Sequence, residues 1–312
     1  MIQVVAGILL NSDGHFLLAK RPVGKIYEGY WEFPGGKVES NEDGSGALIR
    51  ELKEELGIVP KRFKPWVRKT FHYPHGEVCI NFFKVRHWDG VVAPLENQKF
   101  YWQGRGMPGV SPLLEPNIPI LKSLHFPDKY LITNLVEMGE ENFFRQLSRS
   151  VEEQPQMIQV REKHLSVSDL EKFVRKVIDI CAPSGSRIMV NEHIDIAERL
   201  GADGVHLTSA QLGTMTRRPE LPLCSASCHT ADDLARVDEL NLDFAVLSSV
   251  KATQSHPNQI PLGWDTFRSL SAEIKTPIYA LGGLKDSDLK DAWYHGAVGI
   301  AMMRSAWQEI LF

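Results

Sequence analysis

The first 110 residues consist of short apolar runs separated by turn residues, and this pattern predicts β-strands joined by tight turns. One segment, residues 46–56, instead has the apolar spacing of a helix. It stops at Gly57, a residue that ends helices readily because glycine tolerates a positive φ. The turn residues 12–14 lie between two apolar runs and predict a hairpin. Strands are expected at residues 4–10, 16–19, 77–85 and 90–93.

The pattern changes after about residue 128, where short apolar runs typical of strands alternate with amphipathic helical segments. Strands and helices that alternate in this way predict a parallel sheet closed as a (β/α)₈ TIM barrel. A Pro- and Gly-rich stretch at residues 104–119 and a short helix at residues 118–124 precede it. We therefore expect an α/β protein with two domains, residues 1–126 and 127–312. The expected barrel strands are residues 130–133, 157–161, 187–190, 204–207, 223–227, 244–249, 277–281 and 299–302.

The composition of the 312 residues is that of an ordinary globular protein, with 43% hydrophobic and 24% charged residues. A net charge of −4 gives no general attraction to nucleic acid polymers or anionic membranes, so neither is expected as a partner. The four cysteines show no zinc-binding spacing, and the N-terminal apolar run lacks the features of a signal peptide. No apolar stretch approaches the roughly 18 residues of a membrane span. We expect a soluble, cytoplasmic protein.

The helix expected at residues 46–56 carries three carboxylates on one face. Glu51, Glu54 and Glu55 fall within an arc of about 100°, whereas Leu52 belongs to a separate apolar face that can pack into the domain. Three crowded carboxylates repel one another, and a divalent cation removes that repulsion. Mg²⁺ suits such a site because it prefers oxygen ligands and bridges to substrate phosphates.

The loop before this helix completes a continuous motif. Gly35-Gly36 lets the backbone turn tightly beside the acidic face, and Arg50 can orient the carboxylates through paired hydrogen bonds. The segment resembles the Nudix box, G-x5-E-x7-R-E-U-x-E-E-x-G-U with U apolar, at every specified position. The matching residues are Gly36, Glu42, Arg50, Glu51, Leu52, Glu54, Glu55, Gly57 and Ile58.

The Nudix resemblance implies an α/β/α sandwich that hydrolyses a diphosphate linkage with Mg²⁺, or alternatively with Mn²⁺. It gives Glu51, Glu54 and Glu55 the role of metal ligands, with Gly35 or Gly36 adding a backbone carbonyl. Glu51 could instead be the base that deprotonates the attacking water. The residues expected to carry catalysis are Glu51, Glu54 and Arg50.

Residues outside the box resemble the MutT type of Nudix hydrolase. Arg21-Pro22 precedes Trp-Glu-Phe-Pro at the spacing of that subgroup, which implies that Arg21 faces the nucleotide and Phe33 lines the base pocket. The resemblance also implies that Glu96 joins the metal site and that Asn117 reads an oxidised guanine, since an amide both donates and accepts. The leading hypothesis is hydrolysis of 8-oxo-dGTP to the monophosphate and pyrophosphate, which sanitises the nucleotide pool and serves DNA repair. The alternative substrate is a pyrimidine triphosphate, because the motif Trp-Glu-Phe-x-Gly-Gly-Lys also occurs in enzymes with that preference.

The second domain resembles thiamine-phosphate synthase and its TenI relatives over most of residues 129–308. Five segments carry the resemblance, in the same order: residues 157–163, 190–193, 201–207, 227–230 and 280–283. They imply a thiazole or pyrimidine phosphate ligand at the C-terminal ends of the strands, where barrel sites lie. The residues implied are Gln159, Arg161, Lys163 and Asn191 for a pyrimidine diphosphate, Glu192 for a metal ion, Ser227, Thr253 and Ser255 for the pyrimidine or the thiazole phosphate, Gly282 and Gly283 for a phosphate, and His229 as an acid or base.

Three departures from the synthase pattern leave the activity of the barrel open. Glu192 replaces an Asp of the synthase, Gln211 replaces a metal-ligating Asp, and His256 replaces a Lys near the phosphates. Neutralising a leaving pyrophosphate is harder without that Asp and Lys, since Mg²⁺ binding depends on the carboxylates present. The alternatives are thiamine-phosphate synthesis, isomerisation of a thiazole by His229, and a domain that only binds a ligand or is purely structural.

Overall fold

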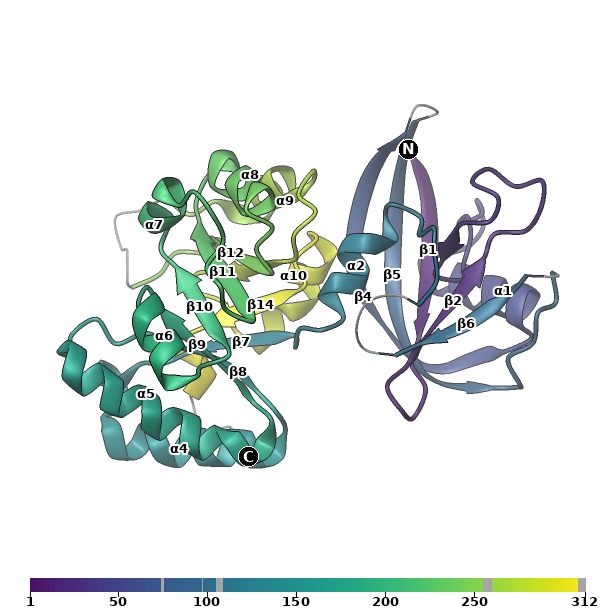
Figure 1. Cartoon of the computed structure of the whole chain (residues 1–312). Helices are drawn as coiled ribbons and strands as arrows, with labels where there is room; N and C mark the ends of the chain where they lie inside the picture. Colours follow the sequence, from purple (N-terminus) through teal and green to yellow (C-terminus); the bar gives the residue numbers. More distant parts are fainter. Residues whose placement is uncertain (74–75, 97, 105–108, 255–259, 308–312) are drawn as a thin grey trace. The chain divides into compact units, whose positions relative to one another are not determined.

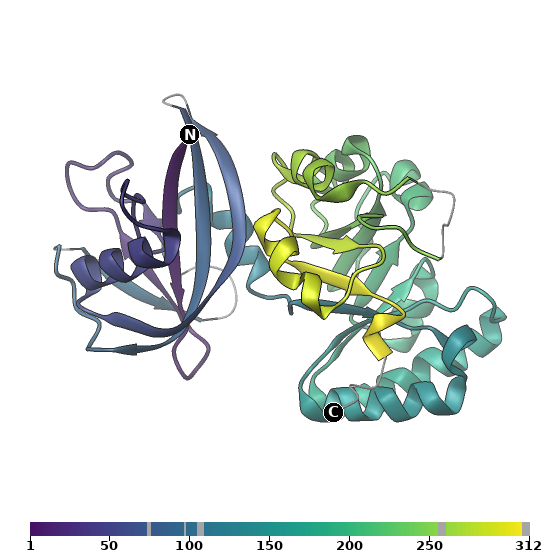
Figure 2. The same ribbon diagram turned by 180° about the vertical axis from the view of Figure 1, so that it is seen from behind.

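The computed structural model describes residues 1–73, 76–96, 98–104, 109–254 and 260–307. The chain divides into two compact units, one of residues 1–125 with 293–296 and the other of residues 126–292 with 297–312. Figure 1 shows the first unit mainly in purple to blue and the second in teal to yellow, and Figure 2 shows both from behind. Each unit has a buried apolar core of its own.

Within the described residues, the first unit consists of two three-stranded sheets and two helices. Its elements are β1 (Ile2–Leu9), β2 (Phe16–Lys20), β3 (Trp31–Glu32), α1 (Gly44–Leu56), β4 (Val59–Tyr73), β5 (Gly76–Asp89), β6 (Phe100–Gln103) and α2 (Asn117–Ser123). In one sheet β5 pairs in parallel with β1 and antiparallel with β4; in the other β2 pairs antiparallel with both β3 and β6. Leu48 and Leu52 of α1 are buried in one cluster with Val5 and Leu9 of β1, which anchors the helix on its sheet.

Two strand predictions for this unit are wrong. The expected hairpin is limited to its turn, where Asn11 N donates to the His15 carbonyl at 3.0 Å and a bridge links Leu10 to Phe16; beyond the turn, β1 pairs with β5 and β2 belongs to the other sheet. Residues 90–93 form no strand. They run past the end of α1 instead, where the N–H groups of Ala93 and Leu95 bond two of the last helix carbonyls. Strand β4, which pairs with β5 through several register shifts, was not expected.

The prediction of the acidic helix is confirmed, with an earlier start. The helix α1 begins at Gly44 because the side chain of Asp43 caps it, accepting a hydrogen bond of 2.7 Å from the N–H of Gly46. It ends at Gly57, whose φ of 70° is the left-handed conformation expected of a glycine at this position. The cap and the glycine together place the acidic residues in the middle and last turn of the helix.

Eight strands of the described chain close into a parallel barrel in the second unit, as the sequence predicted. The strands are β7 (Lys129–Ile132), β8 (Met157–Val160), β9 (Arg187–Asn191), β10 (Gly204–Leu207), β11 (Leu223–Cys228), β12 (Phe244–Ser248), β13 (Ile278–Leu281) and β14 (Gly299–Met302). The helices and 3₁₀ turns are α3 (Leu135–Met138), α4 (Glu140–Glu153), α5 (Val167–Cys181), η1 (Ala182–Ser184), α6 (Ile194–Leu200), α7 (Ser209–Thr214), α8 (Ala231–Glu239), α9 (Gly263–Ser271), η2 (Asp286–Asp288), α10 (Leu289–Tyr294) and η3 (Ser305–Trp307). The barrel places its loops after the strands at one end, where the pocket described below is found.

The four cysteines, Cys79, Cys181, Cys224 and Cys228, are all free and buried, so they pack as small apolar side chains. In the part of the chain that is described, no helix is long and apolar enough to cross a membrane.

Candidate functional sites

Arg50 holds the acidic face of α1 together. Its Nη1 donates to Glu51 Oε1 at 2.8 Å and to Glu54 Oε2 at 3.2 Å. On the other side, Nη2 and Nε donate to the two carboxylate oxygens of Glu42 at 2.6 and 3.2 Å, and Nη2 also donates to the Lys37 carbonyl at 2.9 Å. A guanidinium fixed by so many acceptors holds the carboxylates of Glu51 and Glu54 in place relative to the preceding loop.

Two glycines let the chain pass between β1 and these carboxylates. The Gly36 carbonyl accepts a hydrogen bond from Val5 N at 2.9 Å, and Gly35 N donates to Glu55 Oε2 at 3.0 Å. Gly35 has φ 147°, and a Cβ there would lie 2.1 Å from the Val5 carbonyl oxygen. A Cβ on Gly36 would lie 2.3 Å from Glu51 Oε1. The glycines are therefore needed because the strand and the acidic face leave no room for side chains.

Burial raises the pKa values of two carboxylates of α1, Glu51 and Glu55, and neighbouring negative charges add to the rise. Burial is the main reason that the pKa of Glu55 rises to about 8, and the neighbouring charges of Glu51, Glu32 and Glu96 add to the rise. Burial also raises the pKa of Glu51, although the hydrogen bond from Arg50 opposes this effect. Glu96 lies far along the chain from α1, yet its charge acts on both Glu51 and Glu55, so the fold brings it to the acidic group.

The residues expected at the nucleotide are engaged with other parts of the first unit. Arg21 Nη1 donates to both carboxylate oxygens of Glu32, at 2.6 and 2.7 Å, and its Nε donates to the Ile26 carbonyl at 2.7 Å. Phe33 is only 3% exposed, with its ring 6.2 Å from that of Phe82. Arg21 is thus held at the acidic group through Glu32, whereas Phe33 packs into the core behind it.

Asn117 lies at the start of α2 and is buried, with 4% of its surface exposed. Its backbone N–H donates to the Leu114 carbonyl, but its side-chain Nδ2 has no hydrogen-bond partner among the residues that are described. Gln98 Oε1 is in the same situation. Leaving a buried polar atom without a partner costs about 1–3 kcal/mol, so each of these atoms marks a position where a polar group of a ligand or water is favoured.

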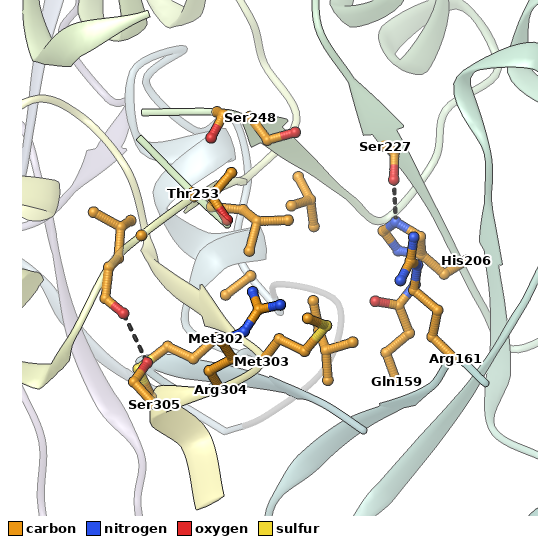
Figure 3. Close-up of a pocket in the computed structure, with 18 of the residues that line it drawn as sticks. Gln159, Arg161, His206, Ser227, Ser248, Thr253, Met302, Met303, Arg304 and Ser305 are labelled. Atoms are coloured by element: carbon orange, nitrogen blue, oxygen red, sulfur yellow. Dashed lines mark hydrogen bonds between the residues drawn. The ribbon is translucent and has the colours of Figure 1, made fainter. Parts of the chain in front are cut away.

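The second unit contains a cavity of about 540 Å³ among the loops that follow the barrel strands. Figure 3 shows Gln159, Arg161 and His206 on one wall, with Arg304 and Ser305 on the other. Gln159 Nε2 donates to Asn191 Oδ1 at 3.0 Å, and both side chains are buried. The amide pair is therefore fixed before any ligand binds.

His206 links the buried centre of the barrel to this cavity. Its Nδ1 lies 2.8 Å from Ser225 Oγ, and its Nε2 lies 2.9 Å from Ser227 Oγ, which faces the cavity. Burial, with a smaller effect from the charge of Arg161, lowers the pKa of His206 to about 3. The imidazole is therefore neutral near pH 7, with one nitrogen as donor and the other as acceptor.

Gly282 and Gly283 form a turn that only glycine can occupy. Their φ angles are 115° and 61°, and a Cβ would meet Ser249 Oγ at 2.1 Å or the Ala252 carbonyl at 2.4 Å, respectively. Both residues line the cavity, so their backbone is exposed to a ligand. Backbone N–H groups in such turns favour anions.

The comparisons with known proteins assign each unit to a family. The NUDIX domain model matches residues 1–102, and the model described as thiamine monophosphate synthase matches residues 129–306. The 8-oxo-dGTP diphosphatase of Haemophilus influenzae is 39% identical over 102 residues, which cover 33% of this chain and 75% of that protein. The Escherichia coli 8-oxo-dGTP diphosphatase is 31% identical over 126 residues, 39% of this chain and 98% of that protein. The putative thiamine-phosphate synthase 2 of Aquifex aeolicus is 31% identical over 180 residues, 57% of this chain and 96% of that protein.

The chain belongs to both families, as a fusion. Its Nudix domain makes it a hydrolase, and Nudix hydrolases use divalent metal ions. The donor set here fits such an ion, because the carboxylates of Glu51, Glu54, Glu55 and Glu96 and the backbone of Gly35 offer oxygen atoms alone. Within the residues described, no three His, Cys, Asp or Glu side chains are already arranged as a metal site.

In the synthase-like domain, most of the expected residues come together around one cavity. Those that line it are Gln159, Arg161, Lys163, Asn191, Ser227, His229, Thr253, Gly282 and Gly283. Glu192 does not line it; its Oε1 lies 3.8 Å from His193 Nε2. Ser255 lies outside the described residues.

Several residues at these sites were missed in the sequence. Glu32 and Glu42 stand in the recognised motifs, but their pairing with Arg21 and Arg50 joins residues 8 to 11 positions apart that do not share one helix or strand. Lys285 and Arg304 line the barrel cavity and belong to no motif, so nothing local distinguishes them from ordinary surface cations.

Proposed function

We propose that the Nudix domain is a Mg²⁺-dependent pyrophosphohydrolase that converts 8-oxo-dGTP and water to 8-oxo-dGMP and pyrophosphate. Water would attack the β-phosphorus, and the bond from that phosphorus to the α–β bridging oxygen would break. The observation that carries the proposal is the carboxylate face of α1, whose Glu51 and Glu54 are fixed by Arg50. In-line phosphoryl transfer depends mainly on positioning and charge neutralisation, which such a face provides once a cation is bound.

Each acidic residue has a distinct place in this proposal. Glu54, Glu55 and Glu96 would hold the ion, with the Gly35 carbonyl as a backbone ligand, since the Gly36 carbonyl already accepts from β1. The bound ion would neutralise the phosphates. Glu51 would share the ion or take the proton of the attacking water, and Arg50 would keep its carboxylate aimed at the reaction centre.

The unpartnered amide of Asn117 supports an oxidised purine as the base. The Nδ2 of this buried side chain can donate to a carbonyl oxygen, while its Oδ1 can accept from a ring N–H. An 8-oxoguanine edge presents both groups. Binding it would satisfy a donor that is buried without a partner, which favours this base over one that lacks the matching group.

The test is a panel of 8-oxo-dGTP, dGTP, dCTP and CTP, each assayed with Mg²⁺ and with Mn²⁺ for pyrophosphate and orthophosphate. We expect pyrophosphate from 8-oxo-dGTP, loss of turnover in Glu54→Gln, and no loss in Lys53→Gln, a control on the exposed side of the same helix. Equal or faster turnover of the pyrimidine nucleotides would replace this proposal with the alternative substrate. Orthophosphate as the product would contradict attack at the β-phosphorus.

Asn117→Ala tests the base assignment separately. Removing the amide should reduce the preference for 8-oxo-dGTP over dGTP by about ten- to a hundredfold, the range for a lost buried hydrogen bond. The melting temperature should not fall, because Nδ2 has no partner in the described protein to lose. Lys122→Ala, an exposed change on the same helix, is the control. Unchanged discrimination would refute the base-reading role.

We further propose that the barrel binds a thiazole or pyrimidine phosphate in its cavity. The glycine turn at Gly282-Gly283 and the cations Arg161 and Lys163 support an anionic group, and the buried Gln159–Asn191 pair supports a polar heterocycle. A cytoplasmic location is part of the proposal, since four buried free thiols suit a reducing compartment. Titration of the full chain with a thiazole ethyl phosphate and with a pyrimidine methyl phosphate tests it; binding of neither would refute it.

A further inference from the structure

The cavity of the barrel is lined by cations without carboxylates. Arg161, Lys163, Lys285 and Arg304 all reach its wall, and no Asp or Glu side chain of the described residues lines it. Figure 3 shows Arg161 and Arg304 on opposite walls. Mg²⁺ sites in proteins rely on carboxylate oxygens, so the side chains that are present attract an anion directly and repel a free cation.

The carboxylates nearest in sequence to the cavity are committed elsewhere. Glu162 is buried and accepts a hydrogen bond from Leu135 N at 3.0 Å. Glu192 does not line the cavity; its carboxylate Oε1 lies 3.8 Å from His193 Nε2, and its backbone carbonyl accepts from Gln211 Nε2 at 2.8 Å. Gln211 in turn caps α7 through its Oε1, which accepts from Thr208 N. A neutral residue with a structural role therefore stands where a second metal ligand would be needed.

Three cations of the cavity wall are available to a ligand. Arg161, Lys163 and Lys285 make no ion pair in the part of the chain described, whereas Arg304 is already paired with Glu137 at 2.6 Å. These charges suffice to balance a phosphomonoester, which carries about −1.5 to −2 at pH 7. A magnesium diphosphate would add a metal ion, for which the cavity has no acidic ligands.

We propose that the barrel cavity binds the phosphomonoester of a heterocycle without a metal ion and does not bind a magnesium diphosphate. This rests on the proposed binding of a phosphorylated heterocycle in the same cavity and specifies its form. The cavity then suits a ligand-binding or isomerising domain, and it lacks the acidic side chains for a reaction that releases pyrophosphate.

The experiment is calorimetric titration of the full chain with two probes, a thiazole ethyl phosphate and a pyrimidine methyl diphosphate. Each is measured in EDTA and in excess Mg²⁺, in a Glu54→Gln background so that the Nudix domain does not hydrolyse the diphosphate. We expect the monoester to bind equally well in EDTA and in Mg²⁺, and the diphosphate to bind more weakly in both. Arg161→Met should weaken monoester binding about ten- to a hundredfold, as expected for a charge-assisted hydrogen bond.

A matched control separates this effect from general charge. Arg268→Met removes a cation that pairs with Asp265 on the surface of α9, outside the cavity, and should leave binding unchanged. Binding of the monoester only with Mg²⁺, or tighter binding of the diphosphate with Mg²⁺, would overturn the metal-free inference but keep a phosphate site in the barrel. Binding of neither probe under any condition would overturn both.

Discussion

The substitution Gly36→Ala should displace the carboxylate of Glu51 and leave the stability of the fold nearly unchanged. Gly36 has no positive φ, so its backbone accepts alanine, but the new Cβ would lie 2.3 to 2.5 Å from the carboxylate of Glu51. Normal contact needs about 1 Å more, and the obstacle is the end of a flexible side chain. The Glu51 carboxylate should therefore move by about 1 Å and lose its 2.8 Å hydrogen bond with Arg50.

We expect Gly36→Ala to lower the catalytic activity much more than the stability. A displacement of about 1 Å at a reacting group lowers the rate by about a hundredfold, so kcat/KM for the triphosphate should fall by that factor. The free energy of unfolding should fall by only about 1 kcal/mol, because one partly exposed hydrogen bond is lost and the core is untouched. Pyrophosphate release at saturating Mg²⁺ measures the first quantity, and urea unfolding followed by fluorescence measures the second.

Two neighbouring glycines provide the comparison. In Gly35→Ala the new Cβ would lie 2.1 Å from the backbone carbonyl oxygen of Val5, and the residue would keep a φ of 147° that alanine rarely adopts. Because both clashing groups belong to the backbone, the free energy of unfolding should fall by about 2–4 kcal/mol. Gly44→Ala has its nearest neighbours at 3.6 Å and should change neither activity nor stability appreciably. Full activity of Gly36→Ala would refute the positioning of Glu51 by this contact. A Gly36→Ala protein as unstable as Gly35→Ala would refute the separation of the two roles.

Three further predictions follow from single residues. Arg50→Lys keeps the charge but loses the fork that holds Glu51; kcat should fall about ten- to a hundredfold with little change in melting temperature, and an unchanged kcat would contradict the role. The pKa of His206, near 6.5 when unfolded, is lowered to about 3 by burial, so stability is lost as pH falls through that window, by up to about 1.4 kcal/mol per pH unit. Urea unfolding from pH 7 to 4.5 should therefore show a flatter dependence of stability on pH for His206→Gln, and equal slopes would exclude a neutral buried imidazole. Gly282→Ala places a Cβ 2.1 Å from Ser249 Oγ at φ 115°, and its free energy of unfolding should drop by about 2–4 kcal/mol, whereas wild-type stability in urea would contradict the packing of the turn.

The acidic face of α1 could be predicted because all of its information is local. A helix fixes which residues share a face, so the spacing of Glu51, Glu54 and Glu55 along the chain is enough to imply their proximity. Gly36 in the preceding loop and Arg50 in the helix itself lie within the same short segment. Glu96 comes close to the acidic face only because the chain returns past the end of α1. The sequence indicated this return only through a loose resemblance to the MutT type.

The pairing of β1 shows where local reasoning failed. The turn at residues 12–14 and the apolar runs beside it match the pattern of a hairpin, but β1 pairs with β5, whose residues lie more than 70 positions further along the chain. Parallel pairing has no turn signal, because the connection is long. The barrel strands were predicted correctly because they are buried on both faces, so each one appears in the sequence as a continuous apolar run.

The two proposed sites offer opposite charges to a phosphorylated ligand. In the Nudix domain the phosphates would meet carboxylates and need a cation between them, whereas in the barrel a bound ester would meet the cations Arg161 and Lys163 of the cavity wall directly. A chelator therefore separates the two chemistries within one preparation. EDTA should stop hydrolysis of the triphosphate while ester binding in the barrel continues. If EDTA abolished both, the cationic side chains of the barrel would be insufficient by themselves, and a metal ion would have to be held by groups other than those that line the cavity.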